Sequence, residues 1–244
     1  MHEQVARIQQ WKAQHRWTMT QKWEHLFFLH WMVPRDVVRP LVPEPLEVDT
    51  FGGKAWIGII LFKMHHFKLR YIPMPYPFSF SEINLRTYVR ANGYPAIFFV
   101  TLDAADPWVV HVAKRWYRLP YYQADIHFKH EGDTFQFHSR RRKREPVERF
   151  RGEFTPVSSG FPPSQGTVEH WLTERYTFFS QPSGHRHIYR GDIYHEPWTL
   201  QTARGRIDVN TMLQSYDIAL PQTPDSVHYA KGVEAIIGSL GTFT

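Results

Sequence analysis

The stretch EINLRTYVRANGYPAIFFVTLD, at residues 82–103, decides the fold class of this chain. Its first part alternates between polar and apolar side chains, which is the period of a half-buried strand. Asn92-Gly93 then supplies a residue pair typical of a two-residue hairpin turn. The apolar run at residues 96–103 follows as the returning strand. The stretch therefore predicts an antiparallel β-hairpin.

The segments on either side add further strands, with helices inserted between them. Upstream, residues 55–64 (AWIGIILFKM) are nearly all apolar, which predicts a strand buried on both faces. Downstream, Asp106-Pro107 has the residue types that begin a helix, and helices are also predicted over residues 167–179 and 209–218. Helices placed between hairpins, without regular alternation of strand and helix, favour an α+β, β-rich fold with a mainly antiparallel sheet.

The composition bounds the kind of protein. The chain has 244 residues, of which 42% are hydrophobic and 16% are aromatic, and we expect residues 1–244 to form a single domain. The only candidate boundary is the segment 145–165. The absence of cysteine excludes disulfides, iron–sulfur clusters and cysteine nucleophiles. With no secretory signal and no long apolar stretch, we expect a cytoplasmic protein without membrane contact.

Short motifs for cofactor chemistry are missing. The sequence has no GxGxxG, no P-loop, no GxSxG and no HExxH. The two tight histidine pairs, His65-His66 and His185-x-His187, lack the further ligands that a metal site needs. We therefore expect no cofactor and no metal.

Part of the formal net charge of +6 lies in the basic run RRRKR, from Arg140 to Arg144. Clustered lysines and arginines can bind phosphates, so association with nucleic acid is an alternative function. Charged residues also protect an edge strand from aggregation. The aromatic residues near the run lack the pattern of an RNA-binding sheet. A nucleic-acid partner is therefore disfavoured.

The polar face of the first hairpin strand carries Glu82, Asn84, Arg86, Tyr88 and Arg90 in one row. Side chains two residues apart on a strand lie on the same face, about 7 Å from each other. If this face meets solvent, it is an ordinary outer surface of an antiparallel sheet. If it lines a cavity, a carboxylate, an amide and two guanidinium groups converge there, and the arginines suit a carboxylate or carbonyl ligand.

Short stretches through most of the chain, in order, resemble the YqjF-like family of uncharacterised bacterial proteins. The matching stretches are His30-Trp31, Leu41-Val42-Pro43, DTFGGKAW at residues 49–56, RTYVR at residues 86–90, Leu102-Asp103-Ala104, Leu119-Pro120-Tyr121, TERY at residues 173–176 and HEPWTL at residues 195–200. That family is similar to the acetoacetate decarboxylase-like superfamily, whose members are β-rich. The resemblance implies one such domain, with the sheet closed into a barrel-like core around a pocket and helices inserted.

The same resemblance bears on chemistry. The decarboxylases form a Schiff base through a lysine within Gly-Tyr-Pro-Lys-Lys. The corresponding stretch here is Arg118-Leu119-Pro120-Tyr121-Tyr122, so tyrosine stands at both lysine positions. Tyrosine cannot form an imine, and we expect decarboxylation by that route to be absent. The resemblance also matches Glu82 to a carboxylate of the decarboxylases.

These matches select the candidate site residues. Tyr121 and Glu82 are the candidate catalytic pair, because a tyrosine hydroxyl can act as a general acid and a carboxylate as a base. The candidate ligand-binding residues are Arg86, Asn84, Tyr88 and Tyr122. Adjacent strand residues point in opposite directions, so only one of the two tyrosines can face a pocket. The superfamily's pattern favours Tyr121.

The sequence thus predicts a protein that binds or acts on a small carbonyl or carboxylate compound without Schiff-base chemistry. As an enzyme it would have a lyase-like or isomerase-like activity. The alternatives are a non-catalytic ligand-binding or sensing protein, and a nucleic-acid-associated protein that uses residues 140–144. The superfamily contains oligomers, so the resemblance is compatible with a homo-oligomer without fixing its number of subunits.

Overall fold

The computed structural model describes residues 2–72, 78–142, 145–182 and 184–243. Its strands are β1 (Trp17–Val33), β2 (Glu47–Val48), β3 (Ala55–Leu69), β4 (Phe78–Ala91), β5 (Tyr94–Ala104), β6 (Tyr121–Glu131), β7 (Thr134–Arg141), β8 (Arg149–Pro156), β9 (Thr177–Ser180), β10 (Ile188–His195), β11 (Leu200–Asn210), β12 (Ser226–Gly238) and β13 (Gly241–Phe243). Its helices are α1 (His2–Gln14), α2 (Arg35–Val38), α3 (Pro107–Trp116) and α4 (Val168–Thr173), with 3₁₀ turns η1 (Arg39–Leu41) and η2 (Gln214–Tyr216). The predicted β-rich class with inserted helices is confirmed.

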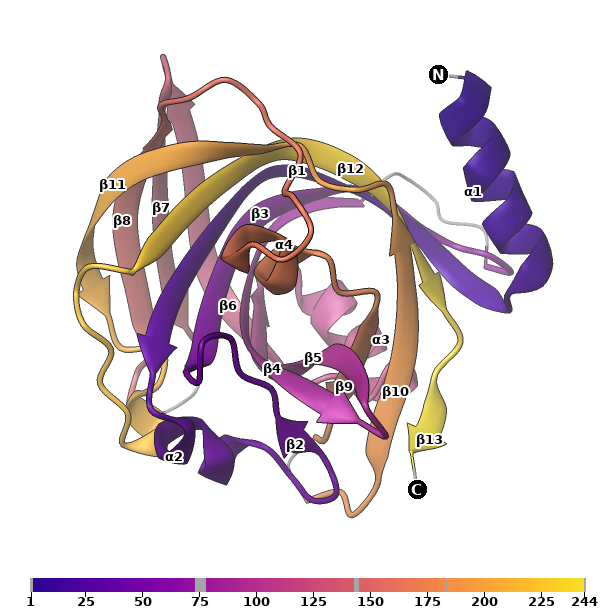
Figure 1. The fold of residues 1–244 in the computed structure, drawn as a ribbon, viewed down its shortest axis with the longest axis horizontal. Helices are drawn as coiled ribbons and strands as arrows, with labels where there is room; N and C mark the ends of the chain where they lie inside the picture. The colour runs from indigo at the N-terminus through magenta and orange to yellow at the C-terminus, as the bar shows by residue number, and fades with distance from the viewer. Residues whose placement is uncertain (1, 73–77, 143–144, 183, 244) are drawn as a thin grey trace.

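In the described part of the chain, the strands form one 13-stranded sheet that closes on itself twice. A shared wall consists of β12, β1, β3, β4 and β5 in successive antiparallel pairings. The two edges of this wall are joined on one side by β6, β7, β8 and β11. On the other side they are joined by β9 and β10. Figure 1 shows these two groups of strands on opposite sides of β1 and β3, so the sheet encloses two interiors.

Each interior has its own hydrophobic core, and the wall strands contribute to both. In β1, Phe27 and Leu29 pack in the core of the first interior, with β7 and β8, whereas Leu26 and Phe28 pack in the core of the second interior, with β9 and β10. This division follows from the two-residue period of a strand. It also explains why residues 55–64 are nearly all apolar, because both faces of β3 are buried there except at Lys63, as predicted.

The hairpin predicted at residues 82–103 is confirmed as β4 and β5, which pair in antiparallel register along their length. Asn92 and Gly93 both have positive φ angles, 51° and 81°. Two successive residues of positive φ give the type I′ turn, whose twist matches that of the strands. The turn fixes the register, and the register decides which side chains of β4 face each interior.

The predicted helix after β5 is confirmed as α3, and it carries the chain from β5 to β6. The Asp106 carboxylate accepts hydrogen bonds from the backbone N–H groups of Trp108 (2.8 Å) and Val109 (3.0 Å). These bonds cap the first turn of the helix. Because β6 runs parallel to β5, with Tyr121 beside Leu102, the crossover through α3 brings Tyr121 to the edge of the shared wall.

Two helix predictions are wrong in part. Helix α4 ends at Thr173, and residues 177–180 form β9, which pairs with β5 and β10. A strand turns Phe178 and Phe179 to opposite faces, and this buries them in different cores. In the segment 209–218, β11 continues to its end at Asn210 through pairing with β8, and η2 is the one helical turn that follows.

The candidate domain boundary, the segment 145–165, contains β8. That strand pairs with β7 on one side and with β11 on the other, so it belongs to the sheet around the first interior. Among the described residues, no helix combines the length and the apolar character that crossing a membrane as a helix would require.

The basic run at residues 140–144 begins at the end of β7, where alternation turns Arg141 into the first interior. Arg141 is fully buried, and its Nε donates to both carboxylate oxygens of Asp103, at 2.7 and 2.9 Å. Its Nη1 donates to the buried carboxylate of Glu148. One cation of the run is therefore part of a buried ion network.

The next residue of the run, Arg142, points outward. It is half-exposed, and its Nε donates to the Asp125 carboxylate at 2.7 Å. Arg140, before Arg141 on β7, is also exposed. The last two cations of the run, at positions 143 and 144, lie outside the described residues. The described part of the run is therefore divided between the core and the surface, which weakens its support for nucleic-acid binding.

We expect Arg141→Leu to lower the free energy of unfolding by about 3–5 kcal/mol, because it removes the cation between two buried carboxylates. The matched control is Arg142→Leu at the neighbouring position, whose exposed ion pair contributes little. Urea unfolding followed by tryptophan fluorescence measures both variants. Equally small losses for the two substitutions would contradict the role of Arg141 in the buried network.

Candidate functional site

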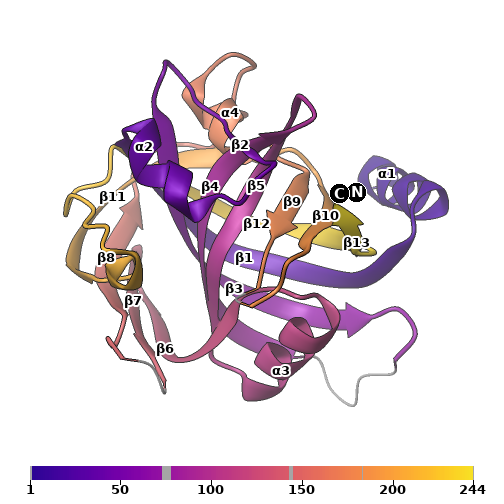
Figure 2. The ribbon, with the colours of Figure 1, turned by 90° about the horizontal axis from the view of Figure 1, so that it is seen from below.

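A cavity lies in the second interior, which β9 and β10 close. Figure 2 shows α3 and α4 on opposite sides of the strands. Tyr117, which follows α3, and Thr173, the last residue of α4, both line this cavity. The cavity has a volume of about 80 Å³, counted as the space that the centre of a water molecule can occupy. This is enough for several waters or one small organic molecule. Most lining residues are apolar. Those with charged or hydrogen-bonding side chains include Gln21, Glu82, Asn84, Arg86, Tyr117, Tyr121, Thr173, Arg175 and His195.

Glu82 and Tyr121 form a hydrogen-bonded pair in this lining. The Tyr121 hydroxyl donates to Oε2 of Glu82 at 2.8 Å. Both side chains are buried, and Glu82 is only 2% exposed. The pairing of β5 with β4 on one side and β6 on the other brings them together. The structure thus brings together the two residues that the sequence selects as a catalytic pair.

Burial sets the protonation of this pair. Loss of water raises the pKa of Glu82 to about 8, and Asp103 raises it as well, against the hydrogen bond from Tyr121, which lowers it. Burial and the adjacent Glu82 raise the pKa of Tyr121 well above its ordinary value. Both groups therefore hold their protons at neutral pH. Glu82 is a neutral carboxylic acid there, with its proton available to a ligand.

Arg86 is a buried cation without an anionic partner. It is 9% exposed, and no carboxylate in the described ranges lies within ion-pair distance of it. Its Nη2 donates to the backbone oxygen of Leu172 in α4 at 3.3 Å. Its guanidinium lies over the rings of Phe28 (5.8 Å) and Tyr88 (5.7 Å). Its Nε has no hydrogen-bond partner among the described residues.

Asn84 and Gly58 complete the surroundings of Arg86 on the shared wall. The Oδ1 atom of Asn84 is buried and lacks a partner within the described part of the chain. Gly58 pairs with Arg86 in the register of β3 and β4. A Cβ atom at Gly58 would lie 3.0 Å from the His30 ring and 3.4 Å from Cγ of Arg86. The glycine therefore leaves room chiefly for the His30 ring, beside the arginine.

A second arginine of the cavity, Arg175, was not found by sequence reasoning. It follows α4, where its Nε donates to the backbone oxygen of Trp171 (2.7 Å) and its Nη1 to Asp49 (2.9 Å). Asp49 also accepts from Nε of Arg90 (2.8 Å). Arg90 is half-exposed and does not line the cavity. The Asp49 carboxylate thus pairs with both Arg175 and Arg90. It makes no ion pair with Arg86.

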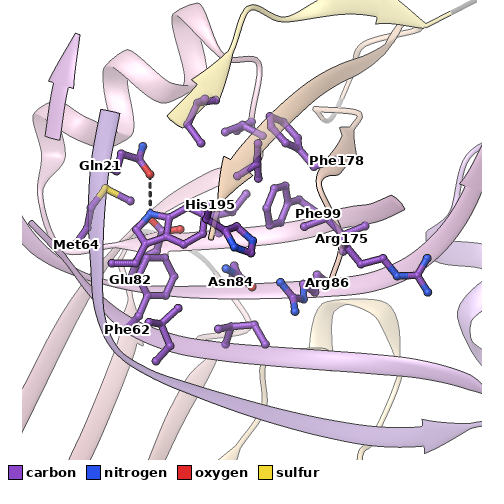
Figure 3. Close-up of a pocket in the computed structure, with 18 of the residues that line it drawn as sticks. Gln21, Phe62, Met64, Glu82, Asn84, Arg86, Phe99, Arg175, Phe178 and His195 are labelled. Carbon is purple, nitrogen blue, oxygen red and sulfur yellow. Dashed lines mark hydrogen bonds between the residues drawn. The ribbon is translucent and has the colours of Figure 1, made fainter. Parts of the chain in front are cut away.

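His195, at the end of β10, was also missed. Its Nδ1 is 2.8 Å from the backbone oxygen of Glu196, so this nitrogen carries the proton in the neutral ring. Burial lowers the pKa of His195 and Arg86 lowers it further, whereas the bond to Glu196 and the charge of Glu174 raise it. The ring is therefore neutral at pH 7. In the view of Figure 3 it lies between Glu82 and Arg86.

Two predicted ligand-binding residues lie outside the lining. Tyr88 is fully buried and its hydroxyl is 2.6 Å from Nε2 of His30. Tyr122 turns to the face opposite Tyr121, with the Arg141 guanidinium 4.4 Å from its ring centre and Lys114 at 5.5 Å. Strand alternation accounts for the opposite directions of the adjacent tyrosines.

No lysine is among the described residues that line the cavity. No group of three or more metal-ligating side chains is found in this part of the chain. In the His65-His66 pair, His65 contacts Ser79 (2.8 Å) and Glu24 (3.2 Å).

Among solved structures, the chain is similar to proteins of the acetoacetate decarboxylase fold. One is the enduracididine biosynthesis enzyme MppR complexed with pyruvate, with a TM-score of 0.65 and 11% identity over 94% of this chain and 91% of that chain. Another is an acetoacetate decarboxylase, with a TM-score of 0.64 and 12% identity over 93% and 90%. The acetoacetate decarboxylase of Legionella pneumophila has a TM-score of 0.61 and 11% identity over 92% and 87%. The predicted fold is confirmed.

Sequence comparison gives the family. The chain is 37% identical over 225 residues to the uncharacterized protein YqjF of Bacillus subtilis (strain 168), covering 92% of each chain. Residues 20–234 match the family DUF2071, described as an uncharacterized conserved protein. The resemblance to the YqjF-like family is therefore confirmed, and the chain belongs to the DUF2071 family.

Proposed function

We propose that this chain binds a small carboxylate that also carries a carbonyl group, in the cavity of the second interior, without forming an imine. The carboxylate contacts Arg86, and the carbonyl oxygen contacts the Glu82–Tyr121 pair. Asn84 offers a further polar contact. Tyr88 and Tyr122 are not part of this proposed site, because neither lines the cavity.

The observation that carries this proposal is the uncompensated charge of Arg86. A guanidinium removed from water without an anionic partner costs several kcal/mol of folding free energy. A protein tolerates this cost at a site where a bound anion pairs with the guanidinium. A carboxylate ligand suits the site because it can accept two parallel hydrogen bonds from a guanidinium. The unpaired Nε of Arg86 supplies one such donor.

The protonated state of Glu82 supports the same ligand class. As a neutral acid, Glu82 adds no negative charge to the cavity, so Arg86 leaves an excess positive charge there. A protonated carboxyl can donate a hydrogen bond to a carbonyl oxygen, as an ionised one cannot. The apolar walls, which include Phe62, Phe99 and Phe178, limit the ligand to a small compound.

The replacement of lysine by tyrosine supports binding without imine formation. By the sequence resemblance, Tyr121 corresponds to the lysine of the decarboxylases, and a phenol cannot condense with a ketone to form an imine. The solved structure of MppR holds pyruvate in a protein of the same fold. We carry over from it only the class of ligand, a small carboxylate with a carbonyl group.

A non-catalytic ligand-binding or sensing protein would use the same contacts, and catalysis distinguishes the two possibilities. The nucleic-acid alternative loses support from the burial of Arg141 and the ion pair of Arg142. A continuous exposed basic face is the usual feature of such a protein, and the described part of the run lacks one.

We expect Arg86→Gln to weaken binding of pyruvate about ten- to hundredfold, the loss of one charge-assisted interaction of about 1.5–3 kcal/mol. Without ligand, the variant should melt at the same temperature as the wild type or higher, because a buried charge without a partner is removed. Titration calorimetry and thermal unfolding measure the two effects.

Arg90→Gln is the matched control for this variant. It also removes an arginine of β4, but one that is half-exposed and outside the cavity, so pyruvate affinity should be unchanged. Borohydride added to the protein–pyruvate mixture should leave the protein mass unchanged, because no imine forms. Equal affinities of the wild type and Arg86→Gln, across pyruvate and other small keto acids, would contradict the proposal.

Carboxylate affinity should fall as pH rises through about 8, where Glu82 ionises. The keto acid is an anion throughout this range, so each added negative charge in the cavity opposes binding. If only the protonated form binds, the affinity falls up to about tenfold per pH unit above that value. Glu82→Gln stays neutral and should show a flat profile. If the affinity of the wild type and that of Glu82→Gln changed with pH in the same way, Glu82 would not be the group that ionises near pH 8.

A further inference from the structure

The cavity holds two proton-carrying groups from different parts of the sheet. Glu82 lies on β4, and His195 lies at the end of β10; both line the same space. His195 is 3% exposed, and its ring is fixed by the contact of Nδ1 with the Glu196 backbone. That contact leaves Nε2, on the other side of the ring, as a hydrogen-bond acceptor. None of the described residues binds Nε2.

We propose that this site catalyses enolisation of the bound carbonyl compound, with His195 as the general base and Glu82 as the general acid. The inference rests on the proposed function, because it needs a keto acid held in this cavity. It goes beyond binding and names a reaction class, proton transfer at the carbon beside the carbonyl.

The proton balance of the step is complete within the site. Nε2 of His195 takes a proton from the carbon next to the carbonyl, and the electrons of that C–H bond form the C=C bond. The π electrons of the C=O bond move to the carbonyl oxygen, which takes the proton of the Glu82 carboxyl group. The products are the enol form of the ligand, whose carboxylate is unchanged, an imidazolium and a Glu82 carboxylate. Return of both protons restores the keto acid, so no oxidant, reductant or second substrate is consumed.

The neighbouring groups support these two roles. Tyr121 already donates to Oε2 of Glu82, so a hydrogen bond is in place for the carboxylate that forms when Glu82 gives up its proton. Arg86 holds the ligand carboxylate and lies near the developing enol. The ring of His195 packs against Trp198, with ring centres 4.6 Å apart, and against Tyr176 at 4.9 Å. These aromatic contacts fix the direction of the base.

The protonation states at neutral pH fit an acid and a base. Burial raises the pKa of Glu82 to about 8, with Asp103 and Tyr121 as the other groups that act on it. Burial lowers the pKa of His195, on which Glu196, Glu174 and Arg86 also act. Because the pKa of the acid is raised and that of the base is lowered, Glu82 carries a proton at neutral pH and Nε2 of His195 carries none. Opposite shifts in a shared cavity are the usual sign of such a division of roles.

Exchange of the methyl protons of pyruvate in D₂O, followed by ¹H NMR, tests the inference directly. The wild type should exchange these protons faster than buffer, with a rate that falls above a pH of about 8 as Glu82 ionises. His195→Asn should lower the exchange rate by about a hundredfold or more, the usual contribution of a general base. Its pyruvate affinity should stay within about threefold of the wild type, because binding depends on Arg86.

The matched control is His228→Asn. His228 is also a buried histidine of this sheet, on β12, but it does not line the cavity, so the exchange rate should be unchanged. Binding of pyruvate without exchange above the buffer rate, or equal rates for the wild type and His195→Asn, would overturn the inference and leave the proposed function standing. Failure of pyruvate and 2-oxobutyrate to bind would instead contradict the proposed function, and the inference would fall with it.

Discussion

The strands of the shared wall must serve two hydrophobic cores at once, because β12, β1, β3, β4 and β5 separate the two interiors of the sheet. Strand alternation sends successive side chains to opposite cores. On β4 this places Ile83 and Leu85 in the first core, while Glu82, Asn84 and Arg86 face the second interior. A polar row that would be hydrated on an open sheet is therefore enclosed, and the cavity chemistry follows from that enclosure.

Enclosure has opposite consequences for the two ionisable groups of that row. Glu82 responds by keeping its proton, because a buried carboxylate without a cation beside it is unfavourable. Arg86, on the same face, is a buried guanidinium cation, and the proposed anionic ligand would supply its counter-charge. The cavity thus combines a neutral carboxylic acid, Glu82, with a cation, Arg86, that has no anionic partner among the described residues. Tyr121 adds no charge to this combination, whereas a lysine at the same position would bring another cation close to Arg86.

The sequence predicts the parts of this site that depend on local pattern. Alternation and the Asn92-Gly93 turn give the β4–β5 hairpin, and the helix cap at Asp106 gives the crossover to Tyr121. The alternation of polar and apolar residues in β4 leaves open whether its polar face meets solvent, because this depends on which other elements cover that face. The covering strand β9 lies in a segment that the sequence predicts as helix. His195 and Arg175 come from this distant part of the chain, so their convergence on the cavity depends on tertiary pairing.

The most direct measurement is a titration of the Glu82 carboxyl group by ¹³C NMR, with the Glu82→Gln variant to assign the signal, in the free protein and with pyruvate. The enclosed cavity predicts a midpoint near 8 in the free protein. Pyruvate should raise it further, because a bound anion and an ionised Glu82 oppose each other and the coupling is reciprocal. A midpoint near the ordinary glutamate value of about 4.3, or one that pyruvate does not move, would contradict an anion-binding cavity with a protonated Glu82.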